Sequence, residues 1–404
     1  MKCGLLGRKL AHSYSPEIHA FFGDYDYKLC ECEPEELEHF VKNGELGGFN
    51  VTIPYKKDVI PMCDELSARA QKIGSVNTIV RKGGRIYGYN TDYDGFLYMV
   101  QASGVTIRGK KAIVLGSGGA SLTVCAVLND LGIGELTVIS RSGDDNYENI
   151  SRHYDAQVIV NATPVGMYPN TGSALVDLTK FTACELVLDL IYNPARTALL
   201  LQADRLGIAY QNGLGMLVSQ AKRASELFCD VLLPDEMIDD ITRKLDFKMR
   251  NLILIGMPGC GKTTVGTILA EITGREFIDC DAEFEKRFGI SAGEDIIKYG
   301  EDNFREKESA VIKSLGCLSG KIIATGGGCV TRHENFVPLR QNAHVLWLRR
   351  ELDKLAIAQR PLSTDLEKMY IERMPLYGLY SDFQLKNDKT PLIAAETILR
   401  RFCE

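Results

Sequence analysis

Apolar runs alternate with amphipathic stretches along most of the 404-residue chain. In the first 95 residues, short apolar segments such as GGFNVTI and VNTIV are separated by helix-like stretches such as PEELEHFVKN. From Lys111 onward the segments KAIVLG, ELTVIS, QVIVNAT and LVLDL are continuously apolar, as is typical of strands covered on both faces. This alternation predicts α/β domains with parallel sheets.

A polar break separates the chain into two parts. The segment NGLGMLVSQAKRASELF predicts a helix with a glycine-rich start, and LPDEMIDDITRKLDFKMRN after it is polar and charged. The apolar strand LILIG follows directly. We therefore predict the main domain boundary near residue 247, with a short linker or a continuation of the preceding helix.

Composition narrows the classes of function. The net charge is −6, with 45% hydrophobic and 25% charged residues, which is an ordinary globular balance. This charge argues against broad binding to nucleic acid or to an anionic membrane, and no apolar run approaches the roughly 20 residues that cross a bilayer. The 12 cysteines are scattered without zinc-site spacing, so we expect reduced thiols in a cytoplasmic protein. The partners that we expect are small molecules. Monomer and homodimer both stay open.

The stretch GMPGCGKTT has the G-x-x-x-x-G-K-T order of a phosphate-binding loop, and it lies between an apolar strand and a predicted helix. In such a loop, backbone N–H groups curl around the phosphates of ATP. Lys262 would reach the β- and γ-phosphates, and the Thr263 hydroxyl would bind Mg²⁺. The nucleotide-binding residues predicted here are Gly259, Cys260, Gly261, Lys262, Thr263 and Thr264.

Further motifs indicate what accepts the phosphoryl group. The strand ending FIDCD places Asp279 and Asp281 two residues apart, and therefore on one face. Arg305, Arg360 and Arg373 lie in EDNFREKES, RPL and ERMPLY, and a glycine-rich turn, IIATGGG, lies between the first two. Three arginines with such a turn suit a small acceptor that carries a carboxylate.

Together these motifs resemble shikimate kinase, a small member of the nucleoside-monophosphate-kinase-like P-loop group, over about residues 250–404. The resemblance implies that Lys262, Asp281 and Arg360 are catalytic, with Arg360 as a lid arginine that stabilises the transferring phosphoryl group. Asp279 would hold Mg²⁺ through water. The lid after Arg360 is shorter than in the family, which leaves the adenine-stacking residue open. The implied shikimate ligands are Asp281, Arg305, Gly327 and Arg373.

The first part contains a second glycine-rich turn. The strand KAIVLG leads into GSGGAS and then into a predicted helix, which is typical of a dinucleotide-binding turn. Arg141 follows the next strand, ELTVIS, where an arginine suits the 2′-phosphate of NADP. Asp144 and Asp145 lie just beyond it and leave NAD or dual use open.

Hydride transfer to a carbonyl also needs a proton donor and acceptor at its oxygen. Lys56 in NVTIPYK and Asp92 in GYNTDYDGF would serve as such a pair. Each residue also has an ordinary interpretation. Lys56 could be a surface lysine, and Asp92 could cap a helix.

Six motifs in order, LAHSYSPEIH, NVTIPYK, GSVNTI, GYNTDYDG, NATPVGM and NGLGMLVSQA, resemble shikimate dehydrogenase over about residues 1–245. The resemblance implies that Lys56 and Asp92 are the catalytic pair. Arg141 is flanked by serines, where the family usually has Asn-Arg-Thr, and Leu122 takes an often basic position. The implied substrate ligands are Ser13 and Ser15 for the carboxylate, Thr52, Asn77, Asp92 and Gln220 for the hydroxyls, and Tyr192 nearby. The implied NADP residues are Gly116, Ser117, Gly118, Gly119 and Ala120 at the pyrophosphate, and Ile191 and Gly213 at the nicotinamide.

The two resemblances imply a bifunctional enzyme that reduces 3-dehydroshikimate to shikimate with NADPH and then phosphorylates shikimate to shikimate 3-phosphate with MgATP. The implied fold is α/β, with a two-lobed dehydrogenase at residues 1–247 and a P-loop kinase domain with a parallel sheet at 248–404. Within the dehydrogenase, the substrate lobe would comprise residues 1–95 plus 205–245, and the Rossmann-like NADP lobe would comprise residues 96–204. Two alternatives stay open. One half, more readily the short-lid kinase, could be a ligand-sensing module without chemistry, or the dehydrogenase could also use quinate.

Overall fold

The computed structural model describes residues 1–10, 13–355 and 366–403. Contacts between residues divide the chain into two compact units. The first unit comprises Met1–Gly166, Ser173–Tyr192 and Gln202–Thr242, and the second comprises Met167–Gly172, Asn193–Leu201 and Arg243–Glu404.

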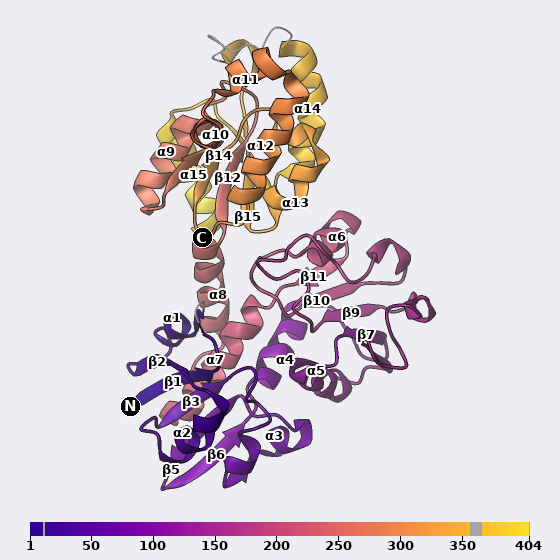
Figure 1. The fold of residues 1–404 in the computed structure, drawn as a ribbon, viewed down its shortest axis with the longest axis vertical. Helices are drawn as coiled ribbons and strands as arrows, with labels where there is room; N and C mark the ends of the chain where they lie inside the picture. Colours follow the sequence, from indigo (N-terminus) through magenta and orange to yellow (C-terminus); the bar gives the residue numbers. More distant parts are fainter. Residues whose placement is uncertain (11–12, 356–365, 404) are drawn as a thin grey trace. The chain divides into compact units, whose positions relative to one another are not determined.

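The first unit begins with a mixed sheet in the order β2-β1-β3-β5-β6-β4 (Figure 1). β1 pairs in parallel with β2 and β3, whereas β5 runs antiparallel to both β3 and β6. The sheet packs partly against α7, a long helix that follows much later in the sequence. The elements of this lobe are β1 (Lys2–Gly7), α1 (Ser15–His19), β2 (Asp26–Glu31), α2 (Leu37–Asn43), β3 (Gly48–Val51), β4 (Glu65–Leu66), α3 (Ala68–Ile73), β5 (Thr78–Lys82), β6 (Arg85–Tyr89) and α7 (Leu214–Cys229).

The second sheet of this unit is parallel, in the order β11-β10-β9-β7-β8. The strands β9 and β10 are buried at every position, as their continuous apolar runs predict. β11 pairs with β10 in this sheet, although the sequence analysis placed residues 205–245 in the substrate lobe. The elements are α4 (Asp92–Ala102), β7 (Lys111–Leu115), α5 (Gly119–Asp130), β8 (Glu135–Ile139), β9 (Val158–Asn161), β10 (Leu186–Asp189), α6 (Ala198–Leu206) and β11 (Ala209–Gln211), of which α6 belongs to the second unit up to Leu201.

The sheet of the second unit is parallel, in the order β13-β14-β12-β15-β16. Helix α8 belongs to the first unit up to Thr242, crosses the predicted boundary at residue 247 without a break and leads into β12. In the same unit, Arg196 pairs with Asp382 at 2.6 Å. The elements are α8 (Glu236–Met249), β12 (Asn251–Ile255), α9 (Lys262–Thr273), β13 (Phe277–Asp279), α10 (Cys280–Phe288), α11 (Ala292–Tyr299), α12 (Glu301–Leu315), β14 (Ile322–Ala324), α13 (Phe336–Arg340), β15 (Ala343–Arg349), α14 (Leu366–Tyr380), β16 (Phe383–Lys386) and α15 (Pro391–Cys403).

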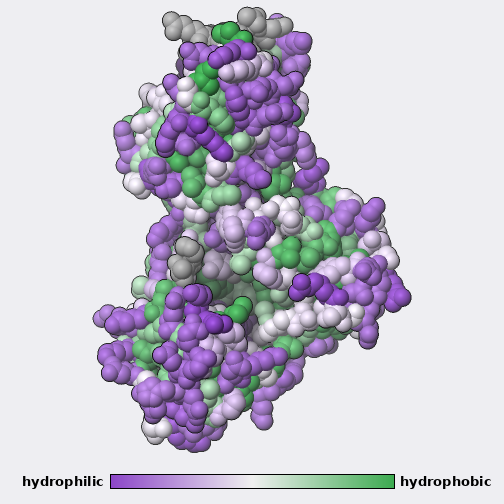
Figure 2. Space-filling model, in the orientation of Figure 1, coloured by the Kyte–Doolittle hydropathy of each residue, from purple (hydrophilic) through white to green (hydrophobic). Residues whose placement is uncertain are grey.

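The predicted α/β architecture is confirmed, although the first sheet is mixed rather than parallel. The face drawn in Figure 2 carries mostly hydrophilic residues, with smaller hydrophobic groups between them. Within residues 1–10, 13–355 and 366–403, no helix combines the length and the apolar character that a membrane span requires.

Candidate active sites

The structure brings Lys56 and Asp92 together in the first unit. Lys56 follows β3, and its Nζ donates to Asp92 Oδ2 at 2.6 Å. The side chains are 22% and 14% exposed, so this is not a solvated surface lysine. The helix α4 begins at Asp92, but its N-cap residue is Thr91, and Asp92 therefore pairs with the lysine instead of capping. A lysine and a carboxylate at this distance can pass a proton through an oxygen bound beside them.

Buried polar residues surround this pair. Asn77 donates from Nδ2 to Thr91 Oγ1 at 3.1 Å and accepts from the Thr91 N–H at 2.6 Å, so it fixes the residue directly before Asp92. Gln220 lies on α7, where α7 packs against α4, and it donates to the Leu217 carbonyl at 2.9 Å. Asn77 therefore contacts the residue before Asp92, and Gln220 lies on the helix that packs against α4, the helix that begins at Asp92.

The two predicted carboxylate ligands also lie together. Ser13 donates from Oγ to Ser15 Oγ at 3.1 Å, at the start of α1. Tyr14, between them, makes an edge contact with Tyr192 at 6.3 Å between ring centroids. Thr52 follows β3, and its N–H donates to the Leu6 carbonyl of β1 at 2.9 Å.

The glycine-rich turn after β7 has the geometry of a phosphate cradle. Gly116 has φ +103°, and a Cβ there would lie 2.6 Å from Thr163 Cγ2, so a side chain is excluded for two reasons. A Cβ at Gly118 or Gly119, where α5 begins, would meet open space. Backbone N–H groups at a helix start favour an anion, so the turn fits the pyrophosphate of NADP. Gly213 donates to the Ile191 carbonyl at 3.0 Å, which brings the two predicted nicotinamide neighbours together.

Residues near Arg141 bear on the choice between NADP and NAD. Arg141 is exposed in the turn after β8, where a 2′-phosphate can reach it. Asp145 Oδ1 lies 2.9 Å from His153 Nε2, so this carboxylate is already engaged by a neighbouring side chain. The geometry therefore favours the arginine over Asp145 as the ribose contact.

The second unit carries the other phosphate loop, between β12 and α9. Gly256 and Gly261 have φ values of +143° and +98°, which only glycine adopts readily. Lys262 donates from Nζ to the carbonyls of Gly256 and Met257 at 2.9 and 3.0 Å. The lysine is thus held across the loop that would wrap a triphosphate, so the residues fit ATP.

The candidate magnesium position lies beside this loop. The Thr263 hydroxyl donates a hydrogen bond to Asp279 Oδ2 at 2.9 Å. Hydroxyl and carboxylate oxygens are ligands that Mg²⁺ prefers. In the described part of the chain, no group of three or more His, Cys, Asp or Glu side chains could hold a metal by itself. One expectation is corrected. Asp281 does not share a strand face with Asp279, because β13 ends at Asp279, which caps α10 and accepts from the Asp281 N–H at 2.9 Å.

A cavity of about 500 Å³ in the second unit is lined by all four predicted shikimate ligands, Asp281, Arg305, Gly327 and Arg373. Arg305 is 5% exposed and donates to Glu308 at 2.7 Å and to Glu301 at 3.0 Å. Burial raises the pKa of the Glu308 carboxyl, Arg305 opposes this rise, and Asp281 adds to it. Glu308 was not among the residues predicted from the sequence, although its place three residues after Arg305 puts both on one helix face. Arg360 lies outside the described residues.

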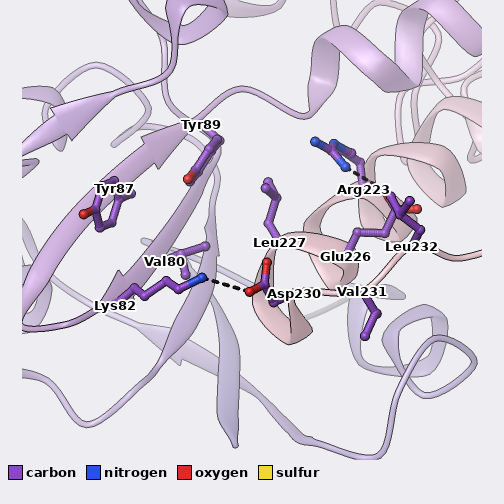
Figure 3. A pocket seen from close by; sticks show the side chains of 10 residues that line it. All are labelled: Val80, Lys82, Tyr87, Tyr89, Arg223, Glu226, Leu227, Asp230, Val231 and Leu232. Carbon is purple, nitrogen blue, oxygen red and sulfur yellow. Dashed lines mark hydrogen bonds and ion pairs between the residues drawn. The ribbon is translucent and has the colours of Figure 1, made fainter.

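Figure 3 shows a different hollow, of about 470 Å³, in the first unit between β5, β6 and the end of α7. Lys82 pairs with Asp230 at 2.9 Å, and Arg223 pairs with Glu226 at 2.8 Å. These charges partner each other, and the hollow contains none of the predicted ligands, so we do not count it as a candidate site.

Two phosphate-binding loops, a lysine and carboxylate pair, and an arginine-lined cavity define a nucleotide-dependent enzyme with two separate sites. A family model described as the shikimate dehydrogenase substrate binding domain matches residues 5–79, and one described as shikimate kinase matches residues 258–403.

Individual relatives agree with this division. The protein named shikimate dehydrogenase (NADP(+)) from Clostridium beijerinckii is 37% identical over 254 residues, which are 58% of this chain and 94% of that protein. The structure of shikimate 5-dehydrogenase from Thermus thermophilus in complex with NADP(H) and shikimate has a TM-score of 0.56 and 30% identity, over 60% of this chain and 99% of that chain. The quinate dehydrogenase from Corynebacterium glutamicum in complex with NAD has a TM-score of 0.55 and 26% identity, over 59% of this chain and 96% of that one. The chain belongs to the shikimate dehydrogenase family in its first part and carries a shikimate kinase domain after it.

Proposed function

We propose that the chain performs two consecutive reactions of the shikimate pathway. The first part reduces 3-dehydroshikimate to shikimate with NADPH, and the second phosphorylates shikimate to shikimate 3-phosphate with MgATP. The observation that carries the proposal is the presence, in one chain, of the Lys56 and Asp92 contact and of the cavity that gathers Asp281, Arg305 and Arg373.

In the dehydrogenase part, Ser13 and Ser15 hold the substrate carboxylate, and Thr52, Asn77 and Gln220 hold its hydroxyls. When bound, NADPH supplies the hydride. Lys56 protonates the carbonyl oxygen as it becomes a hydroxyl, and Asp92, 2.6 Å away, keeps the lysine oriented and shares its proton. Tyr192 lies near the substrate, and burial raises the pKa of its phenol, so this group stays protonated.

In the kinase part, Arg305 and Arg373 bind the carboxylate of shikimate, and Gly327 lets the ring approach the backbone. Asp281 accepts the proton of the attacking hydroxyl. MgATP, when bound, supplies the phosphoryl group, and Lys262 stabilises its charge. Thr263 and Asp279 would hold the Mg²⁺ that accompanies ATP, Asp279 through water, and Arg360 would complete the charge stabilisation. A cytoplasmic location and a monomeric or homodimeric state stay predictions from the sequence.

The experiment separates the two half-reactions in the intact chain. Lys56→Met should abolish NADPH oxidation with 3-dehydroshikimate while added shikimate is still phosphorylated at the wild-type rate. Lys262→Met should retain the reduction and accumulate shikimate. If the wild-type chain binds shikimate and ATP without releasing ADP, the kinase part is a sensing module, as the sequence left open. If quinate is oxidised as readily as shikimate, the quinate alternative holds.

A further inference from the structure

One buried amide of the second unit contacts the phosphate loop from far along the sequence. Asn387 directly follows β16, and it is 5% exposed. Its side-chain Nδ2 donates to the carbonyl of Cys260 at 2.9 Å, across 127 positions of the sequence. Its backbone N–H donates to the carbonyl of Arg349, the last residue of β15, at 2.8 Å. The amide therefore reaches the loop from a backbone that is itself fixed to the neighbouring strand.

The carbonyl that Asn387 holds lies at a critical point of the loop. The peptide between Cys260 and Gly261 is trans, so its carbonyl and its N–H point in opposite directions. In a loop of the G-x-x-x-x-G-K-T type, the N–H groups face the phosphates, and the carbonyls must face away from them. A hydrogen bond that holds the Cys260 carbonyl on the outside of the loop therefore turns the Gly261 N–H toward the inside.

The loop has little means of fixing this peptide by itself. Cys260 lies between Gly259 and Gly261, which have φ values of +79° and +98°, and glycine has the weakest backbone preference of all residues. Asn387 also packs directly on the second of these glycines, because a Cβ at Gly261 would come within 2.8 Å of its Nδ2. Within the described residues, the buried Asn387 Oδ1 has no hydrogen-bond partner. The donating nitrogen is thus the part of this amide that the fold uses.

We propose that Asn387 is a positioning residue of the nucleotide site, which holds the peptide between Cys260 and Gly261 in the orientation that offers the Gly261 N–H to the β-phosphate. The proposal rests on the kinase function proposed above. In this role Asn387 acts through the loop and not through contact with the nucleotide. Its effect should therefore fall on nucleotides that carry a β-phosphate.

The test compares the binding of ADP with that of AMP, which lacks the β-phosphate, to the full-length chain. Equilibrium dialysis with Mg²⁺ and saturating NADP⁺ keeps the dehydrogenase site occupied, so the kinase site alone takes up the adenine nucleotide. In Asn387→Ala we expect the Kd for ADP to rise about ten-fold, and the Kd for AMP to stay within about two-fold of wild type. The ratio of the AMP Kd to the ADP Kd should therefore fall. A smaller folded fraction would not change this ratio.

Asn251→Ala is the matched control. Asn251 is also buried in the second unit, and its Nδ2 donates to the Leu318 carbonyl at 2.8 Å. It begins β12, whereas the phosphate loop follows the other end of that strand. Its loss should leave the ratio at the wild-type value. Fluorescence of Trp347, which is buried in the core of this unit, shows whether each variant is folded. If Asn387→Ala does not accumulate, Asn387→Ser is too short to reach the Cys260 carbonyl, and the same fall is expected.

Lys262→Met separates the possible failures. If Lys262→Met lowers the ratio and Asn387→Ala leaves it unchanged, the positioning role is refuted while the proposed nucleotide site stands. If Asn387→Ala weakens ADP and AMP equally, the amide acts on the part that both nucleotides share, and the positioning role is again wrong. If Lys262→Met also leaves the ratio unchanged, the assignment of the phosphate loop is refuted, and the role of Asn387 with it.

Discussion

The buried ion pair between Arg305 and Glu308 makes a prediction about the stability of the second unit. Both residues are 5% exposed, and they meet at 2.7 Å on α12. Within the described residues, Glu308 Oε1 has no hydrogen-bond partner, and it lies next to Gly326, where a Cβ would come within 2.6 Å of it. Arg305→Met would therefore leave the Glu308 carboxylate buried without its ion-pair partner, with only the longer-range attraction of Arg373.

The expected magnitude follows from this burial. Removing one partner of a buried pair costs about 3–5 kcal/mol, because the other charge is left uncompensated. The second contact of Arg305 adds little, since the Glu301 side chain is 52% exposed. Against a typical total stability of about 5–15 kcal/mol, Arg305→Met should cost a large fraction of the stability of this unit.

The assay can follow this unit alone within the intact chain. Trp347 is the one tryptophan of the sequence, and it is buried on β15 in the core of the second unit. Its fluorescence during urea unfolding therefore reports on that unit and not on the dehydrogenase part. The midpoint for Arg305→Met should fall sharply, whereas Arg332→Met, which breaks a pair with the fully exposed Asp302, should hardly move it.

Removing the stranded carboxylate should restore stability. Arg305→Met/Glu308→Leu should recover most of the loss, because the double variant buries no unpaired charge. A loss below about 1 kcal/mol in Arg305→Met, or a double variant no more stable than the single one, would refute the reasoning.

The same pair predicts a dependence on pH. Burial raises the pKa of Glu308 above 4.5 in the folded state, so folding is favoured while this carboxyl is protonated. Stability is therefore lost as the pH rises from the unfolded pKa through the folded one. Because Arg305 opposes the rise in pKa, Arg305→Met should lose more stability than wild type as the pH rises above 4.5. Equal pH profiles would contradict this.

Three further predictions concern the nucleotide sites. Thr263→Val removes the hydroxyl that bonds Asp279 and should raise the Mg²⁺ concentration for half-maximal kinase turnover about ten-fold or more, and an unchanged Mg²⁺ titration would contradict the assignment. Arg141→Ser should raise the KM for NADP⁺ about ten-fold with little effect on NAD⁺, and equal effects on both cofactors would refute a 2′-phosphate contact. Gly116→Ala would place a Cβ 2.6 Å from Thr163 Cγ2 at a residue with φ +103°. It should weaken NADP⁺ binding about ten-fold in a fluorescence titration, while the second site still binds ATP. Unaltered NADP⁺ affinity would count against the proposed phosphate cradle.

Local patterns predicted the elements that they encode directly. The runs LVLDL and LILIG became β10 and β12, because a short, continuous apolar run is typical of a parallel-sheet strand that is covered on both faces. The two glycine turns lie where strand and helix meet, since their φ values are set within a few residues. The resemblance to shikimate dehydrogenase predicted that Lys56 and Asp92 lie close together, and the structure places them in contact.

Features that depend on tertiary packing could not be predicted in this way. β11 is a short, mostly polar strand, AYQ, whose place in the second sheet is decided by its pairing with β10. The alternation rule for strands failed at Asp281, because the backbone turns into a helix at Cys280. Glu308 was missed because it acts through its buried partner Arg305, and a sequence shows a charge without showing what it faces.

The central proposal is that one chain holds two independent binding sites for shikimate. Calorimetric titration of shikimate into the full-length chain tests this most directly. We predict two sites per chain in the wild type, loss of one in Ser15→Ala, and loss of the other in Arg373→Met. A wild-type chain that binds a single equivalent of shikimate, or a Ser15→Ala variant that still binds two with unchanged affinities, would contradict the account.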